Sequence, residues 1–161
     1  MEPEVRREII LDNYSNPFHK ETKGDDFETA NANNSSCIDN INIFIKFEGN
    51  IIKDAYFDGE ACAISTASTS IMLKEIIGKT KEEAIAIINN FNNMINEQDY
   101  DKEKMNESLA FDEMYKQESR KTCATLPYKA LYKCHFSPLN LHLCQLSPTF
   151  TEGIHIWCFI S

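Results

Sequence analysis

The chain has 161 residues, which is enough for one domain whose hydrophobic core folds without disulfide bonds. Hydrophobic residues make up 42% and charged residues 25%, a composition typical of a soluble globular protein and not of a disordered one. The net charge of −9 argues against nucleic acid or an anionic membrane as a partner, because both attract basic surfaces.

The N-terminal stretch, MEPEVRREIILDNYSN, holds acidic residues and no uninterrupted apolar core, so it does not resemble a signal peptide. No other segment is apolar over the length that a membrane span needs. The expected compartment is therefore the cytoplasm, where thiols stay reduced. Six cysteines in such a chain indicate metal or sulfur chemistry in preference to a disulfide framework.

The first third of the chain predicts a helix, a loop and a hairpin. Apolar spacing over residues 4–14 predicts a short amphipathic helix that ends at an Asn-Pro pair. Residues 19–36 are polar and Asn-rich, which predicts a loop with at most one short edge strand. Alternating apolar residues over 41–47, a Glu-Gly-Asn turn and a second run over 51–57 predict a β-hairpin.

Two helices are predicted next. The apolar spacing becomes helical over residues 64–77, and Gly78 is the expected C-cap of that helix. Thr80 and Glu83 match a capping box, in which each side chain bonds the other residue's backbone N–H. The box opens an amphipathic helix over 80–95.

The segment after these helices is mostly charged. Residues 96–118 predict a solvated excursion with one weak helix over 108–116. A last helix is expected to start near Cys123, because a proline at position 127 is tolerated only in a first helical turn.

Three cysteines share one kind of setting at the ends of predicted elements. Cys37 precedes a strand, Cys62 lies between a strand and a helix, and Cys123 stands at an expected helix start. Asp39 follows Cys37 by two residues and has the same side-chain direction if the segment is extended. Three thiolates and a carboxylate suit tetrahedral Zn²⁺, and helix N-termini at Cys62 and Cys123 are expected to lower those thiol pKa values. The spacing matches no compact zinc motif, so three unrelated core or loop cysteines remain an alternative.

The hydroxyl-rich run over residues 65–70 has a structural explanation. No Gly-rich cradle or catalytic base accompanies it, so a phosphate loop or nucleophile is not indicated. Helix capping and tight packing beside the cysteines account for it better.

Four motifs resemble those of the NifU/IscU-like iron–sulfur assembly family, in the same order. DGEACAISTASTSIM (58–72) resembles the G-x-G-C-x-I-S-x-A-S motif of that family's SufU branch. SSCIDNI (35–41) resembles P-x-C-G-D-x-I, and SRKTCATLPYKAL (119–131) resembles R-x-K-C-A-T-L-x-W-K-A-L. ILDNYSNP (10–17) is similar to the family's N-terminal start, so the resemblance runs from about residue 5 to 133.

The details favour the SufU branch over the IscU branch. Arg120, three residues before Cys123, falls where SufU-type proteins carry an arginine. Thr122 stands where the IscU branch has a histidine, and the long interval between Cys62 and Cys123 resembles the SufU insertion.

The resemblance implies an α+β fold, a single domain in which helices pack a three-stranded antiparallel sheet. It assigns Cys37, Asp39, Cys62 and Cys123 to a Zn²⁺ site at one end of that sheet. The implied function is that of a zinc-dependent, sulfurtransferase-like acceptor, whose standing as an enzyme is left open. It takes persulfide sulfur on Cys37 from a SufS-type, PLP-dependent cysteine desulfurase and passes it to downstream iron–sulfur assembly proteins. Arg120 is expected to pair with an acidic group of the desulfurase, the alternative being a solvated surface arginine.

Two other functions use the same residues. A scaffold would build and transfer a [2Fe–2S] cluster, or bind iron, on Cys37, Cys62 and Cys123, since such clusters also take thiolate ligands. A structural zinc domain would use the metal only to stabilise the fold.

The motifs depart from the family pattern at three positions. Ile38 replaces a glycine between Cys37 and Asp39, and Ala61 replaces the glycine before Cys62. Glycine at such places permits positive φ, which is costly for a β-branched residue, so these departures put the loop geometry and the metal affinity in question. Tyr128 for the family's Trp is a mild change.

The last 28 residues are unlike the rest, which predicts a domain over 1–133 and an atypical extension over 134–161. The extension holds one charged residue, three of the four histidines and the single tryptophan. One interpretation makes it a second metal site, and the other a non-homologous extension, favoured because no ligand pair has a standard zinc spacing. If ordered, it is expected to pack on the domain or on a second chain. The candidate ligands of the second site are Cys134, His135, His142, Cys144, His155 and Cys158.

Overall fold

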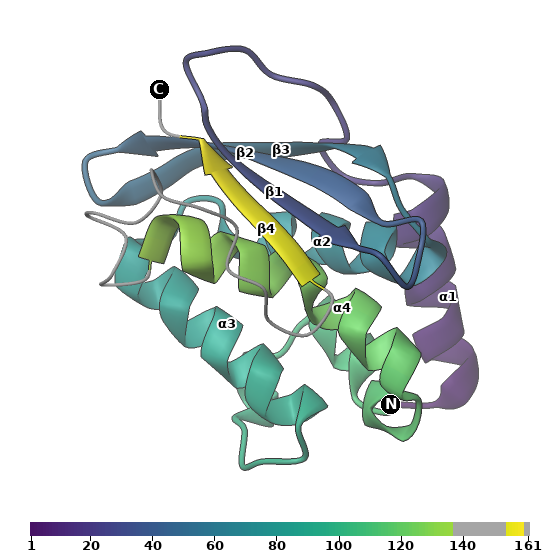
Figure 1. Ribbon diagram of the computed structural model, residues 1–161. Coiled ribbons are helices and arrows are strands. Elements are labelled where there is room, and N and C mark those ends of the chain that lie inside the picture. Colours follow the sequence, from purple (N-terminus) through teal and green to yellow (C-terminus); the bar gives the residue numbers. More distant parts are fainter. Residues whose placement is uncertain (137–153, 160–161) are drawn as a thin grey trace.

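The computed structural model describes residues 1–136 and 154–159 of the chain. Within these ranges, the α-helices are α1 (Pro3–Ser15), α2 (Ala63–Ile76), α3 (Lys81–Ile95) and α4 (Glu118–Leu131). The strands are β1 (Glu28–Asn34), β2 (Asn40–Glu48), β3 (Ile51–Glu60) and β4 (Ile154–Phe159). Four shorter helical segments are η1 (Lys102–Lys104), η2 (Glu107–Phe111), η3 (Met114–Lys116) and η4 (Tyr132–Phe136). Helices lie on one face of a sheet whose strand order is β3-β2-β1-β4 (Figure 1).

The three-stranded antiparallel sheet packed by helices is confirmed. The predicted hairpin is β2–β3, paired from Asn40 opposite Glu60 to Glu48 opposite Ile51, with a register shift after Lys46. The third strand, β1, forms in the Asn-rich segment that was predicted to be mainly loop. Its alternate residues Ala30 and Ala32 are fully buried, so β1 contributes to the core through small side chains.

A fourth strand, β4, extends the sheet at the free edge of β1. It runs antiparallel to β1, from Asn34 opposite Ile154 to Thr29 opposite Phe159. This pairing agrees with the expectation that an ordered extension packs on the domain. Its sequence has no clear strand period, so the strand itself was not predicted. The candidate second metal site falls outside the described residues and side chains, and the domain boundary at residue 133 stays a prediction.

Helix α2 forms the centre of the helical layer. Ten of its fourteen residues are buried, including the hydroxyl residues Ser65, Ser68 and Ser70, while α1 and α4 pack against it. A helix that is buried on every side must satisfy its polar side chains internally. Its hydroxyl groups therefore bond neighbouring elements: Ser70 Oγ donates to Asn13 Oδ1 of α1 at 2.8 Å, and Ser68 Oγ donates to the Ala124 carbonyl of α4 at 2.6 Å.

The predicted start of the last helix was wrong by more than one turn. Helix α4 begins at Glu118, so Cys123 and Pro127 both lie inside it. Proline has no N–H, so Pro127 cannot supply the usual helical hydrogen bond to the carbonyl of Cys123, four residues earlier. That carbonyl is left to a donor from outside the helix.

The other helix predictions fared better. The capping box of α3 is present, with the Glu83 N–H donating to Thr80 Oγ at 3.2 Å and the Thr80 N–H donating to Glu83 Oε2 at 2.8 Å. The weak helix expected over 108–116 is replaced by the short turns η2 and η3. In the described part of the chain, no helix combines the length and the apolar character that crossing a membrane requires.

Candidate metal centre

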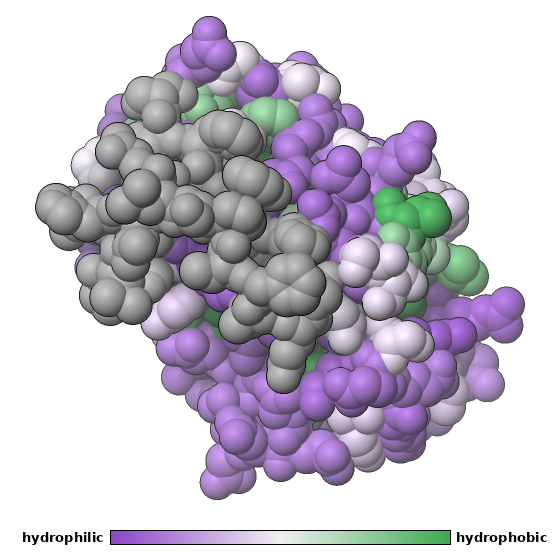
Figure 2. Space-filling model, in the orientation of Figure 1, coloured by the Kyte–Doolittle hydropathy of each residue, from purple (hydrophilic) through white to green (hydrophobic). Residues whose placement is uncertain are grey.

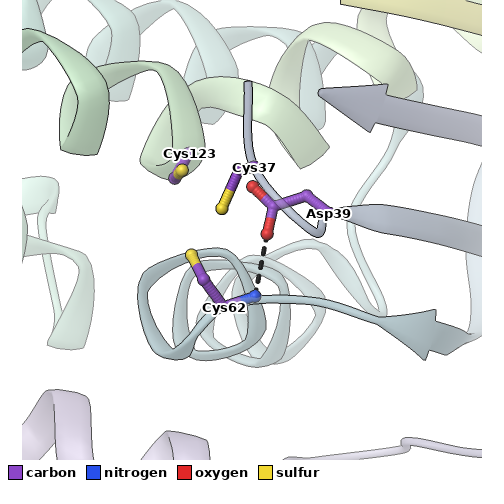
Figure 3. Close-up of side chains that lie close together, drawn as sticks. All are labelled: Cys37, Asp39, Cys62 and Cys123. Carbon is purple, nitrogen blue, oxygen red and sulfur yellow. Dashed lines mark hydrogen bonds between the residues drawn. The ribbon is translucent and has the colours of Figure 1, made fainter. Parts of the chain in front are cut away.

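The four residues singled out in the sequence meet at one end of the sheet (Figure 3). Cys37 lies in the β1–β2 loop, Asp39 directly before β2, Cys62 directly before α2, and Cys123 in α4. Their thiol sulfurs and a carboxylate oxygen all lie within 4.8 Å of one another, and we call this group the Cys₃Asp cluster. Asp39 and Cys123 are buried, whereas Cys37 and Cys62 are partly exposed.

Cys62 occupies the junction between a strand and a helix that the sequence predicted. It is the N-cap of α2, and its Sγ accepts a hydrogen bond from the Ser65 N–H at 3.4 Å. Its own N–H donates to Asp39 Oδ1 at 2.8 Å (Figure 3). The start of α2 therefore fixes both a thiol and a carboxylate of the cluster.

The thiol pKa values follow from these contacts. The pKa of Cys62 is lowered to about 6, first because the Cys123 thiol donates to it and then because the Ser65 N–H does. The same contact with Cys62, together with burial, raises the pKa of Cys123. Burial and the nearby Asp39 raise the pKa of Cys37. The prediction of a lowered pKa at Cys123 was wrong, because Cys123 lies inside α4 and not at its N-terminus, and its thiol donates a hydrogen bond to Cys62.

The buried Ser65 hydroxyl ties the cluster together. Ser65 Oγ lies 2.8 Å from Asp39 Oδ2, to which it donates, and 3.1 Å from the Cys123 carbonyl. This is the carbonyl that Pro127 cannot bond, so one serine links α2, α4 and the residue that precedes β2 beside the thiols. The interpretation of the hydroxyl run as packing next to the cysteines agrees with this contact.

Asn34 supports the cluster in a way that the sequence reasoning missed. Its carbonyl accepts the Cys37 N–H at 3.0 Å, and its Oδ1 accepts the Ser36 N–H at 3.1 Å. Its Nδ2 donates to Cys123 Sγ at 3.9 Å. A buried asparagine at the end of an Asn-rich strand gives no distinct signal in a single sequence, because its neighbours have the same composition.

The two glycine replacements do not strain the backbone. Among described non-glycine residues, positive φ occurs at His19 and Glu97, and so not at Ile38 or Ala61. The Ile38 side chain is 68% exposed and points away from the core. Gly59, by contrast, has φ +108, and a Cβ there would lie 2.0 Å from the Asn40 carbonyl oxygen. Gly59 is therefore the glycine that the backbone beside the cluster requires, and the chain retains it.

A pocket of about 900 Å³ opens beside the cluster, and we call it the cluster pocket. It is bordered by α1, the β1–β2 loop and the first turns of α2 and α4, and its lining includes all three cluster thiols. Arg120 also lines it and is exposed, so the structure brings this predicted residue to the same cavity as the thiols.

The donor set of the cluster suits a metal ion. Three thiols and a carboxylate offer the S and O ligands that tetrahedral zinc takes, and thiolates are also the ligands of iron–sulfur clusters. Half of the group is buried and Asp39 is already oriented by two hydrogen bonds, as expected for a preformed site.

Comparison with known proteins agrees with this geometry. The Bacillus subtilis (strain 168) protein named zinc-dependent sulfurtransferase SufU is 38% identical over 128 residues, covering 79% of this chain and 86% of that protein. The Streptococcus pyogenes serotype M1 protein named iron–sulfur cluster assembly scaffold protein IscU is 36% identical over 124 residues, covering 76% and 77%. A crystal structure from Fervidobacterium islandicum AW-1, described as a candidate iron–sulfur cluster assembly scaffold for the SUF system, superposes with a TM-score of 0.72 at 33% identity, covering 78% of this chain and 93% of that one. Residues 5–126 match the NifU-like N-terminal domain, so the chain belongs to that family.

Proposed function

We propose that this protein accepts persulfide sulfur from a SufS-type cysteine desulfurase and passes it on to iron–sulfur cluster assembly. The observation that carries the proposal is the Cys₃Asp cluster, found in a chain whose relative at 38% identity is named a zinc-dependent sulfurtransferase. The cytoplasm is the compartment we propose, because this chemistry needs reduced thiols.

We assign Cys37, Asp39, Cys62 and Cys123 as the ligands of one Zn²⁺ ion. Zinc bound there would keep the thiols deprotonated, because a coordinated thiol loses its proton. It would also protect them from oxidation, because zinc has no redox chemistry of its own. The carboxylate of Asp39 is a harder ligand than a fourth thiolate and makes the site less tightly closed.

Cys37 is the residue that we assign as the sulfur acceptor. Its thiolate attacks the outer sulfur of the desulfurase persulfide and forms a new S–S bond on Cys37. The bond between the two sulfurs of the donor breaks, and the desulfurase cysteine leaves as a thiolate. Atoms and electrons balance in this exchange, so no external oxidant or reductant is required.

The hydrogen bonds of the cluster favour Cys37 for this step. Cys62 is the N-cap of α2, and Cys123 is held inside α4. Cys37 belongs to a loop, where its N–H bonds Asn34 O at 3.0 Å. A loop residue can turn towards a partner without disrupting a helix.

The relatives named IscU scaffolds support a second candidate, a carrier of a [2Fe–2S] cluster on the same three cysteines. Metal analysis of protein purified without oxygen or chelators separates the two. About one zinc ion per chain, the content of a single four-ligand site, is expected for the sulfur acceptor. Iron with matching sulfide would establish the scaffold instead.

Stimulation of a cysteine desulfurase then tests the sulfur transfer. Adding the zinc-loaded protein to the desulfurase of the same organism should accelerate alanine formation from cysteine. Cys37→Ala should abolish that acceleration while its circular dichroism spectrum stays that of a folded chain. An unfolded Cys37→Ala variant would point to a structural zinc domain, and an active one would contradict the acceptor role.

A further inference from the structure

The hairpin loop that carries Cys37 is closed through the backbone of Asn34. The Asn34 N–H donates to the Asp39 carbonyl at 2.9 Å, which closes the hairpin. The Asn34 carbonyl accepts the Cys37 N–H at 3.0 Å, which closes a β-turn inside that hairpin. Asn34 is the last residue of β1 and is only 5% exposed. The loop of Cys37 is therefore anchored on a buried residue at the end of a strand.

The Asn34 side chain reinforces this turn and extends beyond it. Its Oδ1 accepts the Ser36 N–H at 3.1 Å, the contact that makes asparagine favourable at the first position of a turn. Its Nδ2 donates to Cys123 Sγ at 3.9 Å, and Cys123 belongs to α4. One carboxamide thus joins the loop of one assigned zinc ligand to the helix of another.

The middle of the loop is exposed, in contrast to its ends. Asp39 is 2% exposed, whereas Ser36 and Ile38, on either side of Cys37, are both exposed. Figure 2 shows hydrophobic residues at the surface on the side of the molecule where the β1–β2 loop lies in Figure 1. A loop with buried ends and an exposed middle can swing about its ends, where a few residues absorb the change in backbone angles.

We propose that Asn34 is a positioning residue that latches the Cys37 loop onto α4 and sets how readily Cys37 leaves the metal. The release of Cys37 rests on the sulfur-acceptor function proposed above, whereas the latch rests on the contacts of Asn34. A swing of the loop breaks the bonds from the Cys37 and Ser36 N–H groups to Asn34. Asn34 itself stays in β1, which pairs with β2 and β4 on its two sides, so its Nδ2 remains beside Cys123.

Alkylation of the zinc-loaded chain tests the latch. Iodoacetamide is added in excess, and mass spectrometry follows the modification of each cysteine separately. Asn34→Ala is expected to accelerate modification of Cys37 about fivefold relative to Cys62, because a hydrogen bond that holds the loop is lost. Asn33→Ala is the matched control, a neighbouring asparagine on the opposite face of β1 and outside the cluster pocket, and it should keep the wild-type ratio.

The ratio of the Cys37 and Cys62 rates separates a latch from a merely structural asparagine. A residue that only stabilises the fold would, when replaced, accelerate the modification of Cys37, Cys62 and Cys123 together, and that result would overturn the proposal. A wild-type ratio in Asn34→Ala would overturn it as well. Retained zinc and an unchanged circular dichroism spectrum show that the variant is folded.

Hydrogen exchange in the metal-free protein, followed by NMR, tests the same latch without zinc. Exchange of the Ser36 amide should accelerate about fivefold in Asn34→Ala. It should stay near the wild-type rate in Asn34→Asp, whose carboxylate keeps an acceptor for that N–H. Unchanged exchange in Asn34→Ala would overturn the latch, including in a variant that has lost its zinc.

The two experiments also separate the latch from the proposed function. If wild type binds no zinc while the exchange of Ser36 responds as expected, the proposed function fails and the latch stands. If wild type binds zinc and stimulates the desulfurase, but Asn34→Ala behaves like Asn33→Ala in both experiments, the latch fails and the function stands.

Discussion

Replacement of Ser65 by alanine should destabilise the protein more than replacement of Ser68. Both serines lie on α2, both are fully buried, and each places its hydroxyl on a carbonyl of α4. The helix propensity gained by the change from serine to alanine is the same at the two positions, so it cancels in the comparison. The difference that remains is what each hydroxyl bonds.

The single proton of the Ser65 hydroxyl has two acceptors within hydrogen-bond distance, Asp39 Oδ2 and the Cys123 carbonyl. Asp39 Oδ2 accepts its proton at 2.8 Å in a residue that is 2% exposed, and the Cys123 carbonyl has no N–H from Pro127. Loss of a hydrogen bond to a buried carboxylate costs about 1.5–3 kcal/mol. Ser68 bonds the Ala124 carbonyl, a neutral acceptor, for which the loss is about 0.5–1.5 kcal/mol. We therefore expect Ser65→Ala to lose about 1–2 kcal/mol more unfolding free energy than Ser68→Ala.

Urea unfolding of the two metal-free variants, followed by circular dichroism, measures this difference. A competition titration with a zinc-binding dye should also show weaker zinc binding in Ser65→Ala, because the Asp39 carboxylate loses one of its two orienting hydrogen bonds. Equal unfolding free energies for the two variants would refute the reasoning, since Ser65 would then add nothing beyond ordinary helix packing.

Three further substitutions test other features of the fold. Gly59→Ala should lower the unfolding free energy by more than about 2 kcal/mol in urea, because the new Cβ would lie 2.0 Å from the Asn40 carbonyl oxygen at φ +108; wild-type stability would contradict this. Tyr128→Phe should raise the unfolding free energy by about 1 kcal/mol, because the buried Tyr128 hydroxyl has no hydrogen-bond partner among residues 1–136 and 154–159, and a loss would show that it has one. Burial raises the pKa of Glu75 above its usual 4.5, so its contribution to stability is complete below about pH 4.5 and is lost as the pH rises through the raised pKa. Glu75→Gln should therefore lose less unfolding free energy than wild type between about pH 4.5 and pH 7, and parallel pH profiles would contradict this.

Local patterns in the sequence were sufficient for the elements that local interactions determine. The capping box of Thr80 and Glu83 and the alternation of the β2–β3 hairpin involve residues that are close along the chain. The same holds for the junction at Cys62, where a strand ends and an N-cap begins within two residues. In each case the signal and the structure share one short segment.

The features that were missed depend on contacts between distant segments. β1 has the sequence ETANANN, which has low strand propensity, and it becomes a strand because β2 and β4 pair with it on both sides. α4 continues through Pro127 because a serine from another helix reaches the carbonyl that the proline leaves without its usual donor. The pairing of Arg6 with Asp112 across more than 100 residues likewise has no local signature.

The same contacts indicate how the cluster could release one ligand and keep the others in place. Asp39 accepts hydrogen bonds from the Cys62 N–H and from the Ser65 hydroxyl. Ser65 on α2 also contacts the Cys123 carbonyl on α4, the carbonyl that Pro127 leaves without its usual donor. The hydrogen bonds that join Asp39, Cys62 and the Cys123 carbonyl through Ser65 therefore do not pass through Cys37. Cys37 sits on a loop next to the exposed Ile38 and lines the cluster pocket. For the proposed sulfur acceptor, ligands that are held without Cys37 would keep the metal bound while the Cys37 thiol reacts.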